Sequence, residues 1–84
     1  MIDRLNYDQE LDTSGLSCPL PILKTKKALV TMEVGERIYV VATDPGSLPD
    51  FQAFAEQTGH TLLRADESDG RFHFVLEKVA RKTA

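Results

Sequence analysis

The chain has 84 residues, of which 42% are hydrophobic and 27% are charged, and its formal net charge is −3. This length is enough for one small domain with a single core, and it excludes a multidomain enzyme. A stand-alone nucleic-acid binder is usually basic, so the acidic balance argues against direct contact with nucleic acid.

A short strand is expected first, over residues 10–12 or at its longest 9–13, followed by a turn at residues 13–15. A helix comes next. Pro19 suits its first position, where the fixed φ is helical and the missing N–H costs nothing, and Gly35 ends the segment. Spacings of three and four residues predict a buried face made of Ile22, Thr25, Leu29 and Met32, with Lys24, Lys27 and Thr31 on the opposite side.

A second strand and a second helix follow. Residues 38–42 are apolar throughout, which predicts a central strand covered on both faces, or nearly so. The Ser47–Asp50 spacing is typical of a helix start in which Ser47 is the cap and Asp50 reaches back to it. Gly59 suits the helix end. Leu48, Phe51, Ala55 and Thr58 are expected to share one face of this helix, with Phe54 beside that face.

Two final strands are predicted, over residues 61–65 and 72–77, joined by a hairpin at Asp69-Gly70. Because βαβ crossovers are right-handed, both helices should cover one face of a mixed four-stranded sheet. The fold class is therefore α+β, a two-layer α/β sandwich in the order βαβαββ. We expect one domain spanning residues 1–84, with its core at about residues 9–79 and a basic tail at residues 80–84.

Cys18 is the only cysteine, so it cannot form an internal disulfide. This favours a reducing compartment, the cytoplasm. The N-terminus has no apolar run typical of a signal peptide, and no stretch approaches the ~20 apolar residues that span a bilayer. We expect a cytoplasmic monomer that does not contact a membrane.

The position of Cys18, where a loop becomes a helix, favours a reactive thiol. The unpaired N–H groups and the dipole of a helix start stabilise a thiolate and lower its pKa from about 8.5. With Cys18 as the cap, Pro19 and Pro21 lack N–H groups, and the N–H of Leu20 is the nearest remaining donor. We expect it to be available for a hydrogen bond to the Cys18 thiolate or to a sulfur attached to it. Two fixed φ values make this turn stiff. A lone cysteine is more often a small buried residue, but the prolines and the loop-to-helix position reverse that preference here.

The motif at residues 11–21 has the pattern Leu-Asp-x-x-Gly-Leu-x-Cys-Pro-x-Pro. It resembles the TusA/SirA-like family of small sulfur-carrier proteins, and the resemblance covers about residues 10–78. The family implies a two-layer βαβαββ sandwich and a persulfide on Cys18, with no other cofactor. Gly15, Pro19, Leu20 and Pro21 are then the residues that shape the site, and Lys24 and Asp44 are candidate partner contacts.

The resemblance further implies a sulfurtransferase that takes sulfur from a cysteine desulfurase or a rhodanese-type donor. It passes this sulfur to an acceptor protein in tRNA thiolation, molybdenum-cofactor metabolism or sulfur oxidation. The alternative is a non-catalytic interaction or regulatory module that uses the Cys-Pro-x-Pro turn only for docking. A peroxidase-type thiol ranks third, because no resolving cysteine is present.

Metal binding and hydrolysis are not expected. Zinc needs three or four ligands, and Cys18, His60 and His73 show no ligand spacing. A Cys–His hydrolase needs a histidine beside the thiol, and neither histidine is close to Cys18 in sequence. His60 is interpreted as a capping or packing residue after the second helix, and His73 as a residue on the weaker face of its strand.

Overall fold

The computed structural model of the chain describes residues 7–17 and 19–80. The order of elements is the predicted one, strand, helix, strand, helix, strand, strand. Their bounds are β1 Gln9–Thr13, α1 Leu20–Val30, β2 Arg37–Ala42, α2 Ser47–Thr58, β3 Thr61–Ser68 and β4 Arg71–Glu77. Neither helix of the described residues has the length and apolar character needed to cross a bilayer.

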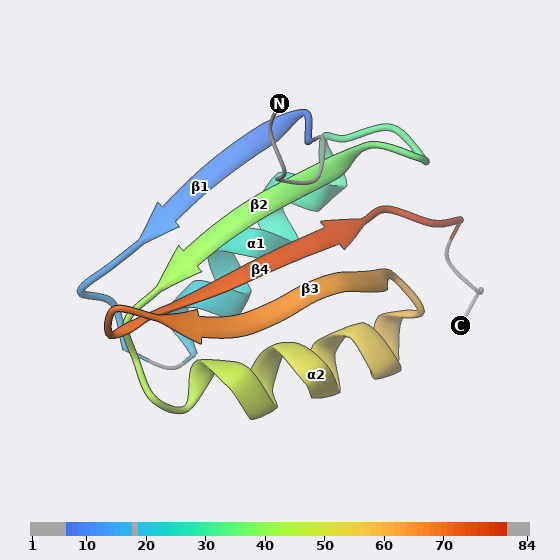
Figure 1. The fold of residues 1–84 in the computed structure, drawn as a ribbon. Helices are drawn as coiled ribbons and strands as arrows, with labels where there is room; N and C mark the ends of the chain where they lie inside the picture. Colours follow the sequence, from blue (N-terminus) through green and yellow to red (C-terminus); the bar gives the residue numbers. More distant parts are fainter. Residues whose placement is uncertain (1–6, 18, 81–84) are drawn as a thin grey trace.

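The four strands form one mixed sheet in the order β1-β2-β4-β3 (Figure 1). β1 pairs parallel to β2, whereas β4 pairs antiparallel to both β2 and β3. Both helices lie on the same face of the sheet, with α1 against β1 and β2 and α2 against β3 and β4. The predicted two-layer sandwich is therefore confirmed, and the strand order, which the sequence left open, is added.

The core lies between the sheet and the helices. Ile38, Val40 and Ala42 of β2 point into it and are fully buried. Phe51 of α2 stacks on Phe74 of β4 with ring centroids 4.1 Å apart. The prediction that β2 is covered on both faces, or nearly so, holds fully for its inner face and only in part for the other. The alternate residues Tyr39 and Val41 are half-buried, because neither α1 nor α2 packs on their side of the sheet.

The inner face of α1 agrees largely with its predicted periodicity. Thr25, Leu29 and Met32 are buried as expected, whereas Ile22 is half-buried and Pro21 is buried in its place. The residues predicted to lie on the outer side, Lys24, Lys27 and Thr31, are exposed.

α1 ends at Val30 and not at Gly35 as predicted. The ammonium group of Lys78, which follows β4, donates hydrogen bonds to the carbonyl oxygens of Leu29 and Met32, each 2.6 Å long. The last carbonyls of a helix have no partner within the helix. A lysine from the far end of the sequence satisfies them here and so stabilises the end of the helix.

The start of α2 also differs from the prediction. Gly46 is the residue at the N-cap, Ser47 is the first helical residue, and no side chain caps the helix. Asp44 holds this turn instead, because its carboxylate accepts from the N–H of Gly46 and its carbonyl oxygen accepts from the N–H of Ser47. The hydroxyl of Ser47 is buried and has no hydrogen-bond partner among the described residues.

The other turn predictions agree with the structure. Gly59 ends α2 with a φ of 85°, and the hairpin residues Asp69 and Gly70 have φ values of 56° and 77°. This pair of positive φ values matches the twist of the two strands that the turn joins. Pairing with β4 extends β3 to Ser68, beyond the predicted end at residue 65, although its last residues are polar.

We predict that Lys78→Met destabilises the protein by about 1–3 kcal/mol, because two carbonyl groups lose a charged donor while the aliphatic stem is kept. The measurement is the free energy of unfolding from urea titration. Lys24→Met, at an exposed position of α1, is the matched control and should change stability by no more than about 0.5 kcal/mol. Equal effects of the two substitutions would contradict the capping role.

Candidate functional site

Two loops leave the sheet at the same edge, because the parallel strands β1 and β2 end side by side. Residues 14–17 lead from β1 towards α1, and residues 43–46 lead from β2 to α2. The N–H of Gly15 donates a hydrogen bond of 2.9 Å to the hydroxyl oxygen of Thr43. This bond joins the loop that precedes Cys18 to its neighbour.

Further hydrogen bonds hold the loop of residues 14–17. The N–H of Leu16 donates to the carbonyl oxygen of Thr13 over 3.1 Å, and the N–H of Ser14 donates to a carboxylate oxygen of Asp12 over 2.9 Å. Hydrogen bonds from the side chain and the backbone of Ser14 lower the pKa of Asp12 from its usual value of 3.8. The Asp12 carboxylate is therefore charged at neutral pH and available as a fixed acceptor.

Gly15 has a φ of 83°, a conformation that L-residues with a side chain rarely adopt. The expectation that Gly15 shapes the site thus has a backbone reason. At the base of the same loop, the buried hydroxyl of Thr13 donates to the carbonyl oxygen of Val41 over 2.6 Å. This bond ties the end of β1 to the end of β2.

The helix begins one residue later than the sequence predicted. Pro19 is the N-cap of α1, Leu20 is its first residue and Pro21 its second. The N–H of Leu20 donates to the carbonyl oxygen of Ser17 over 2.9 Å. The expectation that Leu20 offers this N–H to the sulfur was therefore wrong, because a tight turn uses it.

Pro21 is buried and anchors the first turn of α1. Its carbonyl oxygen accepts a 2.8 Å hydrogen bond from the hydroxyl of the buried Thr25. Cys18 itself lies outside the described residues. Its two sequence neighbours, Ser17 and Pro19, are exposed, so solvent reaches the chain on both sides of it.

Exposed apolar side chains follow the Cys-Pro-x-Pro motif. Leu20 is 43% exposed and Leu23 is 52% exposed, and the two lie about one turn apart on the same face of α1. Lys24 is exposed beside them. Asp44 is half-buried and is occupied with the turn before α2.

Both histidine rings have a nitrogen atom within hydrogen-bond distance of a group elsewhere in the fold. His60 is 7% exposed, and its Nδ1 atom accepts from the N–H of Val79 over 3.2 Å. His73 is half-buried on the helix-free face of the sheet, where its Nδ1 atom lies 2.7 Å from the hydroxyl oxygen of Tyr39. Within residues 7–17 and 19–80, no three His, Asp or Glu side chains are placed to hold a metal ion.

The sequence analysis missed Thr13 and Thr43, which connect the strand ends and the two loops. A signal for them exists in the chain. Each lies at or directly after the end of a predicted strand, and sites in parallel sheets form outside the carboxyl ends of the strands. Thr13 and Thr43 can be recognised as partners only when β1 and β2 are known to be neighbours, and the structure provides this strand order.

Comparison with known proteins adds to this geometry. Residues 9–78 match the family described as Sulfurtransferase TusA. The chain is 56% identical over 73 residues to the sulfur carrier protein TusA of Allochromatium vinosum, an alignment that covers 87% of this chain and 96% of that protein. The crystal structure of a SirA-like protein from Desulfitobacterium hafniense superposes with a TM-score of 0.75 at 27% identity, covering 87% of this chain and all of the other.

We predict that Thr43→Val accelerates hydrogen exchange of the Gly15 amide by about fivefold, since the loss of one hydrogen bond is worth roughly 1 kcal/mol. The exchange is measured by NMR below the unfolding transition. Thr61→Val, at an exposed position of β3, is the control and should leave the Gly15 amide unchanged. Unchanged exchange in Thr43→Val would show that this bond does not hold the loop.

Proposed function

The chain belongs to the TusA family of sulfurtransferases, and we propose from this that it carries sulfur as a persulfide on Cys18. The observation behind the proposal is the extent of the family match. It spans residues 9–78 and includes the only cysteine of the chain. A sulfur carrier needs one reactive sulfur atom, and Cys18 is the only thiol that can supply it.

The proposed transfer has two displacement steps. The Cys18 thiolate attacks the outer sulfur of a persulfide on the donor protein, a new S–S bond forms on Cys18, and the donor leaves as a thiolate. The acceptor thiolate then attacks the same outer sulfur and releases Cys18 as a thiolate. One sulfur–sulfur bond forms and one breaks in each step, so no external oxidant or reductant is needed.

The start of α1 supports this chemistry. Cys18 is two residues before the first helical residue, Leu20, close to the positive end of the helix dipole, which stabilises a thiolate. A low thiol pKa favours Cys18 both as an ionised nucleophile and as a leaving group. Because the chain has no second cysteine, the persulfide cannot collapse to an internal disulfide and persists until a partner arrives.

The surface beside the motif suits a protein partner. We propose that the exposed Leu20 and Leu23 contact the donor and the acceptor in turn, and that the exposed Lys24 attracts a carboxylate at the edge of that contact. The donor is then a cysteine desulfurase or a rhodanese-type protein. We place the carrier in the cytoplasm as a monomer, where the thiol is kept reduced between transfers.

We predict that incubation with a cysteine desulfurase and cysteine adds the mass of one sulfur atom to the protein, as measured by intact mass spectrometry. Reductant should remove this mass, and Cys18→Ser should not acquire it. Thr31→Ser, a conservative change at the exposed C-cap residue of α1, is the matched control and should be loaded like the wild type.

The same experiment distinguishes the alternative function. The exposed leucines would also serve a docking module that transfers no sulfur. If desulfurase and rhodanese donors bind the protein but leave its mass unchanged, the docking function replaces the carrier function.

We also predict that the alkylation rate of Cys18 by iodoacetamide rises with pH to a midpoint below the value of about 8.5 for free cysteine, by one unit or more. The physical reason is the helix dipole, and the rate is followed by mass spectrometry between pH 5 and 10, a span wide enough to include both midpoints. A midpoint at or above that of free cysteine would contradict stabilisation of the thiolate by the start of α1.

A further inference from the structure

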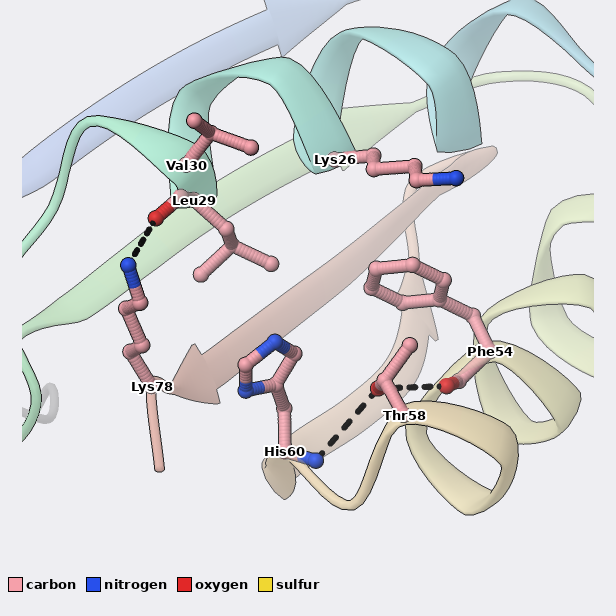
Figure 2. A pocket seen from close by; sticks show the side chains of 7 residues that line it. All are labelled: Lys26, Leu29, Val30, Phe54, Thr58, His60 and Lys78. Carbon is pink, nitrogen blue, oxygen red and sulfur yellow. Dashed lines mark hydrogen bonds between the residues drawn. The ribbon is translucent and has the colours of Figure 1, made fainter. Parts of the chain in front are cut away.

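A cavity of about 320 Å³ lies at the C-terminal ends of the two helices (Figure 2). It is far from the Cys18 loop, since Leu29 follows Leu20 by nine residues, about 14 Å along the helix axis. Its lining comes from α1, α2 and the segments beside β3 and β4. The lining residues are Lys26, Leu29, Val30, Phe54, Thr58, His60 and Lys78.

The inner wall of the cavity is apolar. The side chains of Leu29, Phe54 and His60 point towards one another from three different segments (Figure 2). The rings of Phe54 and His60 have centroids 6.2 Å apart. Because Nδ1 of His60 accepts from the N–H of Val79, the neutral ring has its proton on Nε2. The volume falls at the lower end of the range of small-molecule sites, about 300–1,000 Å³.

The charged part of the lining is entirely cationic. Lys26 and Lys78 supply ammonium groups, and the lining has no aspartate or glutamate. Lys78 donates two hydrogen bonds to carbonyl oxygens of the α1 end. An ammonium group has three N–H donors, so one donor of Lys78 remains beyond these two bonds. The carbonyl groups are neutral, so the positive charge of Lys78 is not compensated by a negative charge. Neither lysine forms an ion pair with a carboxylate in the described part of the chain.

We propose that this cavity binds a small amphipathic organic anion, a carboxylate or sulfonate with an apolar body. The apolar body contacts Leu29 and Phe54, and the anionic group pairs with the exposed ammonium group of Lys26. The ammonium group of Lys78 is turned to the end of α1, on the other side of Leu29 (Figure 2), and adds positive charge at longer range. The combination of an apolar wall with two cations and no acid selects this class over neutral apolar molecules and over cations. The proposal does not depend on sulfur transfer at Cys18.

The test uses 8-anilinonaphthalene-1-sulfonate, a fluorescent aromatic sulfonate, with three forms of the intact chain. Wild type should show saturable binding. Lys26→Glu should raise the Kd by about tenfold, equivalent to ~1.4 kcal/mol. Lys27→Glu reverses a charge at an exposed position of the same helix outside the cavity and should stay within about twofold, as expected for a charge screened by solvent.

Two further measurements make the result decisive. NMR amide shifts on addition of the sulfonate should concentrate at Leu29, Phe54, Thr58 and His60, which separates this cavity from the unspecific binding of the dye to loosened states. The uncharged analogue N-phenyl-1-naphthylamine should bind at the same residues with a Kd about tenfold higher. Lack of saturable binding, shifts elsewhere, equal effects of the two lysine variants, or equal affinity for the uncharged analogue would each overturn the proposal.

Discussion

The parallel pairing of β1 with β2 brings the ends of two strands to one edge of the sheet, where Thr13 and Ala42 are register partners. The buried hydroxyl of Thr13 bonds across the pair to Val41. Because both chains must turn at this edge, the loops that follow emerge together, and the N–H of Gly15 reaches the hydroxyl of Thr43. The loop that leads to the start of α1 depends on this pairing.

α1 is held at both ends by residues distant in sequence. Its first turn follows a loop that is tied to Thr43, and its last carbonyls are bound by the ammonium group of Lys78. The buried face between these ends packs on β1 and β2. A helix fixed in this way holds Leu20 and Leu23 in constant positions, which would lower the entropy cost of the proposed partner contact.

The parallel direction of β1 and β2 also has a consequence at the opposite end of the sandwich. Each helix runs back from the end of one of these strands, so the C-terminal ends of both helices meet there. Free carbonyl groups at helix ends favour cations. Lys78 meets that demand, and the two lysines of the cavity leave a surplus of positive charge beside an apolar wall. The proposed anion site thus follows from the same topology as the proposed sulfur site.

The sequence by itself determined the order of elements, the inner faces of the helices, the hairpin at Asp69-Gly70 and the motif around Cys18. All of these depend on local periodicity or on the backbone preferences of proline and glycine, which act over a few residues. Only the tertiary structure decided the strand order, the open face beside Tyr39, the start of α2 at Ser47 and the end of α1 at Val30. The strand order and the end of α1 depend on contacts between residues distant in sequence, such as Lys78 with Leu29. The face of the sheet beside Tyr39 is open because both α1 and α2 cover the other face. At α2, Asp44 holds the turn in place of the expected serine cap, a choice between two local caps that residue spacing alone does not settle.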